Sequence, residues 1–106
     1  SLNLESWIFL YIFFELNLIK ELGYDTNLGQ NKFQKVNIDD LNKIKIDGYI
    51  YDVPNFLILK KIPDKYSNIL IKKSLNFTRH VMQNKFFIPN NIQIPKSRVI
   101  LENYFN

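Results

Sequence analysis

The sequence predicts a mainly α-helical small domain, with about four helices and a short β-hairpin near residues 43–51. Three observations predict this class. The 106 residues are 46% hydrophobic and 15% aromatic, which suits one domain with its own core. Two long stretches, residues 4–22 and 64–84, repeat apolar residues every three or four positions. Between them, Asp47-Gly48 is a strong two-residue hairpin signal. We expect a single domain over residues 1–106.

The first helix is expected to run from about residue 4, or from Ser6 as N-cap, to Leu22. Gly23 follows the last periodic residue, where a left-handed residue can close the final turn, and Tyr24 can fold back onto that turn. One face of this helix is apolar, with Glu15 its single polar member. Its residues are Ile8, Tyr11, Ile12, Glu15, Leu18, Ile19 and Leu22.

Residues 7–14 are an uninterrupted apolar run, but a membrane-spanning helix needs about 20 such residues. The flanks of a signal peptide are also missing. We therefore expect a helix that is buried on most of its circumference. Because the chain starts at Ser1 and enters this helix almost at once, we expect a fragment whose N-terminal partner domain is missing, and that this domain buries part of the helix.

Residues 25–32 are expected to form a polar loop, and the least stable part of the domain is expected between residues 25 and 52. Apolar and polar residues alternate around Val36 and Ile38 and again around Ile44 and Ile46. We expect a hairpin over residues 43–51, with a helical turn at residues 39–41 as the alternative.

A short helix is expected next, because Pro54 suits a first helical turn and Phe56, Leu57 and Leu59 supply apolar contacts. Lys60, Lys61 and Pro63 should end it.

Asp64 is the expected N-cap of the second long helix, which should run to about Asn84. One half of its surface should pack in the core: Tyr66, Leu70, Ile71, Ser74, Leu75, Phe77, Thr78, Val81 and Met82. The opposite arc is polar and basic, with Ile69 as its apolar exception: Lys65, Lys72, Asn76, Arg79 and Gln83, with Lys73 and His80 at its edge.

Residues 86–94 should connect this helix to a last one that Ser97 caps and that ends at Tyr104. Its apolar residues Val99, Ile100, Leu101 and Tyr104 are available to pack.

The net charge of +4 is unevenly distributed. Residues 1–53 hold five Lys against eight Asp and Glu, a net charge of −3, whereas residues 54–106 hold nine Lys and Arg against two acids, a net charge of +7. An anionic partner, nucleic acid or an acidic peptide, would be attracted to the C-terminal half. The candidate residues for partner or DNA binding on the second long helix are Lys65, Lys72, Lys73 and Arg79, with an ordinary solvated helix face as the alternative.

Lys96 and Arg98 are further candidates for partner or DNA binding. Both lie at the start of the last helix, where a cation opposes the helix dipole. Such a placement indicates either a partner or an acidic neighbour such as Glu15 or Glu21.

No catalytic or metal-binding pattern is present in the sequence. There is no cysteine, His80 is the only histidine, and the three glycines are too isolated for a phosphate-binding loop. We expect no catalytic residues, no metal and no cofactor, and the lack of cysteine suits a reducing cytosol.

Four segments together resemble the C-terminal domain of the RecO family of bacterial recombination mediators. Phe14-Glu15-Leu16, followed by Leu22-Gly23-Tyr24, is similar to that family's FEL and LGY segment. Residues 53–57 resemble its LPxFL segment, residues 77–79 its FTR segment and residues 94–98 its LxSR segment. Their order and spacing match over roughly residues 14–104.

The resemblance implies a non-enzymatic, cytoplasmic protein of recombinational DNA repair. It implies annealing of complementary strands and, with RecR, help to RecA in displacing single-stranded DNA-binding protein, whose acidic tail is an expected partner. The family's main DNA-binding element is an N-terminal OB-fold, which this chain does not contain. This chain alone should therefore bind single-stranded DNA weakly and with steep salt dependence.

Two departures limit what the resemblance carries over. Many members hold zinc with four cysteines between the first two segments, whereas Asn31 stands near the first of those positions here, so zinc is not expected. Some members have arginines just before the glutamate, in a region associated with capture of the acidic tail, whereas this chain has Ile12 and Phe13. The alternative function is a structural or protein-interaction domain without nucleic-acid contact.

Overall fold

The computed structural model describes residues 6–26, 28 and 41–106. These residues form four α-helices, one π-helical turn and one antiparallel hairpin, which confirms the predicted mainly α domain with a short hairpin. Their bounds are α1 Ser6–Glu21, β1 Leu41–Ile46, β2 Tyr49–Pro54, α2 Asn55–Leu59, α3 Asn68–Met82, η2 Gln83–Phe87 and α4 Lys96–Tyr104.

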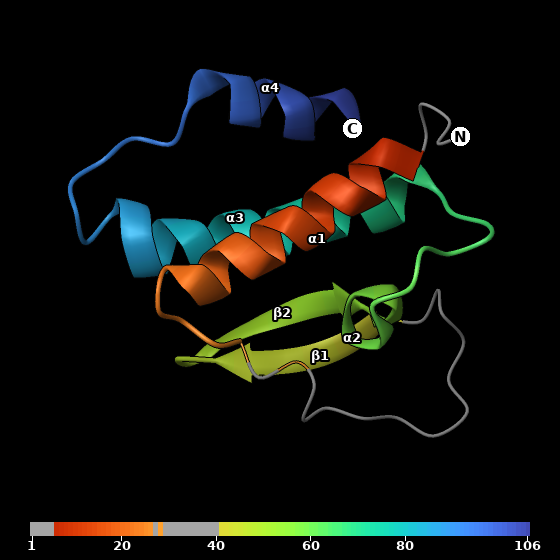
Figure 1. Ribbon diagram of the computed structural model, residues 1–106, viewed down its shortest axis with the longest axis horizontal. Coiled ribbons are helices and arrows are strands. Elements are labelled where there is room, and N and C mark those ends of the chain that lie inside the picture. Colours follow the sequence, from red (N-terminus) through yellow and green to blue (C-terminus); the bar gives the residue numbers. More distant parts are fainter. Residues whose placement is uncertain (1–5, 27, 29–40) are drawn as a thin grey trace.

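Helix α3 is the central element of the described fold. It contacts α1, β2 and α4, and Figure 1 shows α4 on one side of the α1–α3 pair and the hairpin with α2 on the other. The predicted packing face of α3 is confirmed, because its eight helical members are all buried. Tyr66, the ninth, lies just before the helix and is half-buried.

The end of α1 follows the sequence prediction within one residue. Gly23 has a φ of +98°, its N–H donates to the Lys20 carbonyl at 3.0 Å, and the Tyr24 N–H donates to the Ile19 carbonyl at 3.2 Å. These two bonds form a Schellman motif, in which a glycine takes the left-handed position without steric cost. Helix α1 therefore ends at Glu21, with Leu22 as its C-cap.

The buried face of α1 differs in part from the predicted one. Ile8, Ile12, Glu15 and Ile19 are buried as expected, but Leu18 and Leu22 are exposed and Phe9 is fully buried. Four apolar side chains of α1 are exposed in the described residues, on the part of the helix whose burial was assigned to another domain. These are Trp7, Leu10, Phe14 and Leu18.

The hairpin is confirmed and is longer than predicted. Asp47 and Gly48 both have positive φ, 52° and 85°, as a type I′ turn requires, and they place Ile46 opposite Tyr49. Ile44 and Ile46 point into the core while Lys43 and Lys45 are exposed, which is the predicted alternation. Leu41 begins β1, and the remaining expectations for residues 27 and 29–40 lie outside the described residues.

Helix α2 is confirmed as a short helix after Pro54. Phe56 and Leu57 are fully buried, and the Phe56 ring meets those of Phe9 and Phe13 edge to face at 5.2 and 6.1 Å. Leu59 is 39% exposed, contrary to its predicted packing role.

The predicted N-caps of α3 and α4 are wrong. Helix α3 starts after Ser67 rather than Asp64, because Tyr66 leaves the helical path to pack on Phe9, with ring centroids 4.7 Å apart. Helix α4 starts after Pro95 rather than Ser97: the carbonyl of Pro95 accepts the Arg98 N–H at 3.0 Å.

The segment after α3 continues helical further than predicted. In the π-helical turn η2, the Ile88 N–H donates to the Gln83 carbonyl at 2.8 Å. Pro89 removes only its own N–H, so the chain completes the next turn with Asn90 bonded to the Phe86 carbonyl.

Helix α4 lies with its apolar side outward, contrary to the predicted packing of its apolar residues. Its buried residues are Arg98 and Glu102, whereas Val99, Ile100 and Tyr104 are 38%, 68% and 79% exposed; Leu101 is half-buried. Ion pairs, rather than apolar contacts, decide which side of α4 faces α3.

Candidate functional site

A buried polar network joins α1, α3 and α4 at the centre of the domain. Arg98 of α4 donates from Nε to Oε2 of Glu15 at 2.5 Å and from Nη2 to Oε1 at 3.0 Å. Arg98 and Glu15 are only 6% and 2% exposed. Arg98 also donates to the carbonyl of Leu75 at 2.9 Å. Burial opposes the charge of Arg98, but the hydrogen bond and charge of Glu15 outweigh it and raise its pKa.

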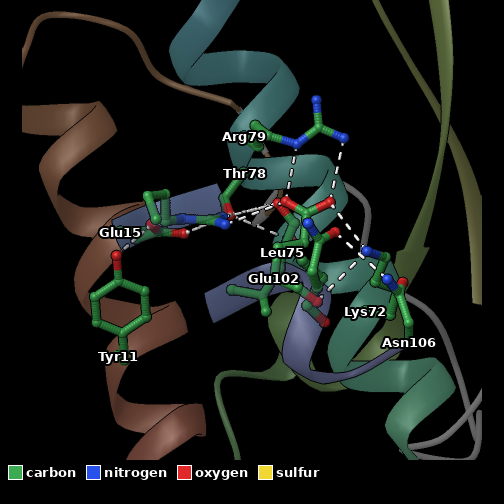
Figure 2. A network of polar contacts seen from close by, with 11 residues as sticks. Tyr11, Glu15, Lys72, Leu75, Thr78, Arg79, Glu102 and Asn106 are labelled. Atoms are coloured by element: carbon green, nitrogen blue, oxygen red, sulfur yellow. Dashed lines mark hydrogen bonds and ion pairs between the residues drawn. The ribbon is translucent and has the colours of Figure 1, made fainter. Parts of the chain in front are cut away.

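Two hydroxyl groups complete the surroundings of Glu15. Thr78 donates to Oε1 at 2.6 Å and Tyr11 donates to Oε2 at 2.8 Å. Figure 2 shows Tyr11 and Glu15 on α1 facing Thr78 on α3. Burial, together with the hydrogen bond to and the charge of Glu15, raises the pKa of Tyr11 to about 12. The hydroxyl is therefore held in its donating, neutral form.

The second half of the network is centred on Glu102 of α4, which is 4% exposed. Arg79 donates to its two carboxylate oxygens at 2.8 and 3.2 Å, and Arg98 donates to Oε1 at 3.1 Å. Lys72 Nζ lies 3.6 Å from Oε2, and Figure 2 shows Glu102 between Lys72 and Arg79. Burial raises the pKa of Glu102, but these arginines outweigh burial and lower it.

The six predicted binding residues are thus divided by the structure. Lys65 and Lys96 are exposed. Lys72 and Arg79 bind Glu102, and Lys73 binds Asp52 of β2 at 3.2 Å. Arg98 lies inside the domain on Glu15, the acidic neighbour that the sequence had offered as one alternative.

A hollow of about 380 Å³ lies between β2 and the polar side of α3. Tyr49, Ile50 and Asp52 border it from β2, and the α3 side is formed by Lys72, Lys73, Asn76, Phe77 and His80, with Tyr51 between them. Tyr49 is 57% exposed, and its ring also borders a second hollow, which Lys85 lines. Exposed aromatic and cationic side chains therefore meet at this edge of the hairpin.

An apolar groove of about 670 Å³ lies between α1, α4 and the residues that lead into α3. Its walls include Trp7, Ile8, Tyr66, Ile71, Ile100, Leu101, Tyr104 and Phe105. Lys65 and Lys96, the two exposed members of the six predicted binding residues, directly precede groove residues in the sequence. Lys65 precedes Tyr66, and Lys96 precedes Ser97.

His80 is half-buried beside Tyr51, with ring centroids 5.9 Å apart. Burial and the charge of Arg79 lower its pKa. In the described parts of the chain no three His, Cys, Asp or Glu side chains group as metal ligands. Within the same parts, no helix combines the length and the apolar character needed to cross a bilayer.

Sequence reasoning missed the roles of Glu102, Thr78 and Tyr49. Glu102 lies four residues after Arg98 on one helix, a spacing that places an acid and a base on the same face. That spacing was the available signal. Nothing local marks Thr78 as a partner of Glu15, because the two are 63 positions apart.

Comparison with known proteins finds no family model, no curated protein and no solved structure that matches this chain.

Proposed function

We propose that this chain is the helical C-terminal domain of a RecO-like recombination mediator. It would be a non-enzymatic, cytoplasmic binding module in recombinational DNA repair, acting with RecR and recruited through the acidic tail of single-stranded DNA-binding protein. The observation that carries the proposal is the meeting of Glu15, Thr78 and Arg98 in one buried network.

These three residues come from three of the four segments that resemble the family. The fourth segment supplies Phe56, whose ring packs against Phe9 and Phe13 of α1. All three later segments thus contact α1, the helix on which the first segment lies. Their convergence supports reading the four segments as parts of one structural unit.

The apolar groove between α1 and α4 is the surface that best suits an acidic peptide ending in an apolar residue. Its walls are apolar, and Lys65 and Lys96 lie beside it in the sequence. An apolar terminal side chain would enter the groove while the acidic residues would remain near these lysines. The cations of α3 are less suited, because Arg79 and Lys72 hold the buried Glu102, which leaves the partly exposed Lys73.

The test is fluorescence anisotropy of a labelled peptide that copies the acidic tail, titrated with the domain at low and moderate salt. We expect saturable binding that Ile100→Asp abolishes and that Lys96→Ala weakens, most strongly at low salt. Ile88→Asp and Lys61→Ala are matched controls, since both positions are exposed and outside the groove. Binding that ignores Ile100→Asp, or no binding at high protein concentration, would contradict this site.

The alternative is a structural or protein-interaction domain without nucleic-acid contact. The internal pairing of Lys72, Lys73, Arg79 and Arg98 favours it, because ion pairs reduce the charge offered to phosphates. A domain of this kind would show no salt-dependent binding to single-stranded oligonucleotides.

A further inference from the structure

We propose that the hollow between β2 and α3 binds single-stranded nucleic acid, with a base against the ring of Tyr49 and the adjoining phosphate at Lys73. The proposal rests on the proposed function and adds to it a site on this domain, separate from the peptide groove. The hollow is lined by Tyr49 of the hairpin and by Lys72 and Lys73 of α3.

The first step concerns Tyr49. Its side chain is 57% exposed although it stands on the same face of β2 as the buried Tyr51 and Val53. The type I′ turn at Asp47-Gly48 sets the backbone beside Tyr49, and the Tyr51 ring lies 6.4 Å away. An aromatic ring open to solvent beside cations is the arrangement on which proteins stack the bases of single strands.

The second step concerns charge. Asp52 is shared by two lysines, Lys73 at 3.2 Å and Lys43 at 2.5 Å, so this cluster holds one cation more than it holds carboxylates. The network behind it has the same excess, because Lys72, Arg79 and Arg98 face only Glu102 and Glu15. The polar side of α3 therefore keeps a positive field after its internal pairs are counted.

The third step concerns the class of ligand. A phosphate can be met by Lys73, whose side chain is 37% exposed, and an amide and an imidazole, from Asn76 and His80, can bond the edge of a base. Duplex DNA keeps its bases stacked inside and offers no ring face to Tyr49, whereas a single strand offers one at every nucleotide. An acidic peptide would use the cations but not the exposed ring.

The experiment measures binding of a labelled oligothymidylate of about eight nucleotides and of a matched abasic strand over a range of salt concentrations. We expect tighter binding of the strand with bases. Tyr49→Ala should weaken it about tenfold, whereas Tyr49→Phe should retain most of the affinity, because the ring is kept. Lys73→Ala should reduce the slope of log affinity against log salt by about 0.7, the value for one phosphate contact.

Two control variants remove the same chemistry elsewhere. Phe14→Ala deletes an exposed ring on α1, and Lys61→Ala deletes an exposed cation after α2; neither should change oligonucleotide binding. Thermal unfolding monitored by circular dichroism should confirm that all variants are folded, which is expected because Tyr49 and Lys73 are both partly exposed.

The outcomes separate this site from the proposed function. Equal affinity for the abasic strand, or no effect of Tyr49→Ala, would overturn the site, and so would the absence of any oligonucleotide binding. In each case the peptide titration would still report on recruitment through the α1–α4 groove. If the peptide does not bind while Tyr49→Ala weakens oligonucleotide binding, this site is supported and the recruitment role is contradicted.

Discussion

Arg98 and Glu15 are 83 positions apart in the sequence and form a buried, two-bond ion pair that fastens the last helix to the first. Leu101 and the adjoining Phe105 pack against the core, but Val99, Ile100 and Tyr104 are exposed. The attachment of α4 to the domain therefore depends on charge, and its stability should respond to charge changes more than to the loss of apolar side chains.

Removing Arg98 should be strongly destabilising. Arg98→Met leaves the Glu15 carboxylate buried without its cation, and breaking a buried pair in this way typically costs about 3–5 kcal/mol. Urea unfolding followed by circular dichroism measures the loss. The double variant Glu15→Gln with Arg98→Met should recover about 1–3 kcal/mol of it, because no charge is then left unpaired.

Tyr104→Ala is the matched control on the same helix, because its side chain is 79% exposed and it should change stability little. A loss below about 1 kcal/mol for Arg98→Met, or additive effects of the two changes in the double variant, would show that α4 is held by other contacts.

Local signals in the sequence were sufficient where one short segment decides the structure. Gly23 marked the end of α1, and Asp47-Gly48 marked the hairpin, because positive φ angles are required there and few residues adopt them readily. The periodicity of α3 was enough to identify its buried face, since most of that face is apolar.

The orientation of α4 could not be predicted in the same way. Its apolar residues indicated one face. The buried face is set instead by two ion pairs with other elements: Arg98 with Glu15 of α1, and Glu102 with Arg79 of α3. The predicted start of α3 was wrong for a similar reason, because Tyr66 packs on Phe9 of α1. A single sequence does not reveal such long-range contacts, so the assignment of Arg98 to a binding surface missed its internal partner.

The domain should lose stability in acid through Glu102 and Asp52. In both residues the folded pKa is lowered from the ordinary values of 4.5 and 3.8. For Glu102, burial opposes the shift and the hydrogen bonds and charges of Arg79 and Arg98 outweigh it; for Asp52, hydrogen bonds from Lys43 and Lys73 lead. A lowered carboxyl pKa stabilises the fold above the ordinary value, and this contribution is lost as pH falls through the folded pKa.

Glu102→Gln isolates this contribution in urea unfolding at several pH values. The variant should be less stable than the parent near neutral pH, and the difference should shrink once pH falls below about 4.5. A difference that stays constant down to the lowest pH at which the protein folds would mean that folding does not lower the pKa of Glu102.

The Tyr11 hydroxyl should ionise at a higher pH than an ordinary tyrosine, because it belongs to this network. Its folded pKa of about 12 lies above the ordinary value of 10.0, so its contribution is complete below pH 10 and is lost as pH rises through 12. Tyr11→Phe removes the hydrogen bond to Glu15 and should cost about 1–2 kcal/mol near neutral pH.

Ultraviolet absorbance of tyrosinate, compared between the parent and Tyr11→Phe, gives the titration of this one hydroxyl. The difference should rise only near pH 12. Tyr104→Phe is the control for the loss of one exposed tyrosine from the absorbance. If the Tyr11 component titrates near pH 10, the hydroxyl does not donate to Glu15 in the folded protein.

Lys60 offers a stabilising substitution. It follows α2 with a φ of 58°, and both its own N–H and the next one, of Lys61 at 3.3 Å, donate to the Phe56 carbonyl. A lysine in this left-handed position carries a steric cost that glycine avoids. Lys60→Gly should therefore raise the free energy of unfolding by about 0.5–1 kcal/mol, measured by urea titration.

Two comparisons decide whether backbone strain is the cause. Asn91 takes the same position after the turn that follows η2, with a φ of 57°, and Asn91→Gly should gain less, because asparagine tolerates this conformation better than lysine. Lys61→Gly, one residue beyond the strained position, should give no gain, since glycine there only adds freedom to the unfolded chain. Equal stabilisation by Lys60→Gly and Lys61→Gly would point to relief of charge repulsion rather than of backbone strain.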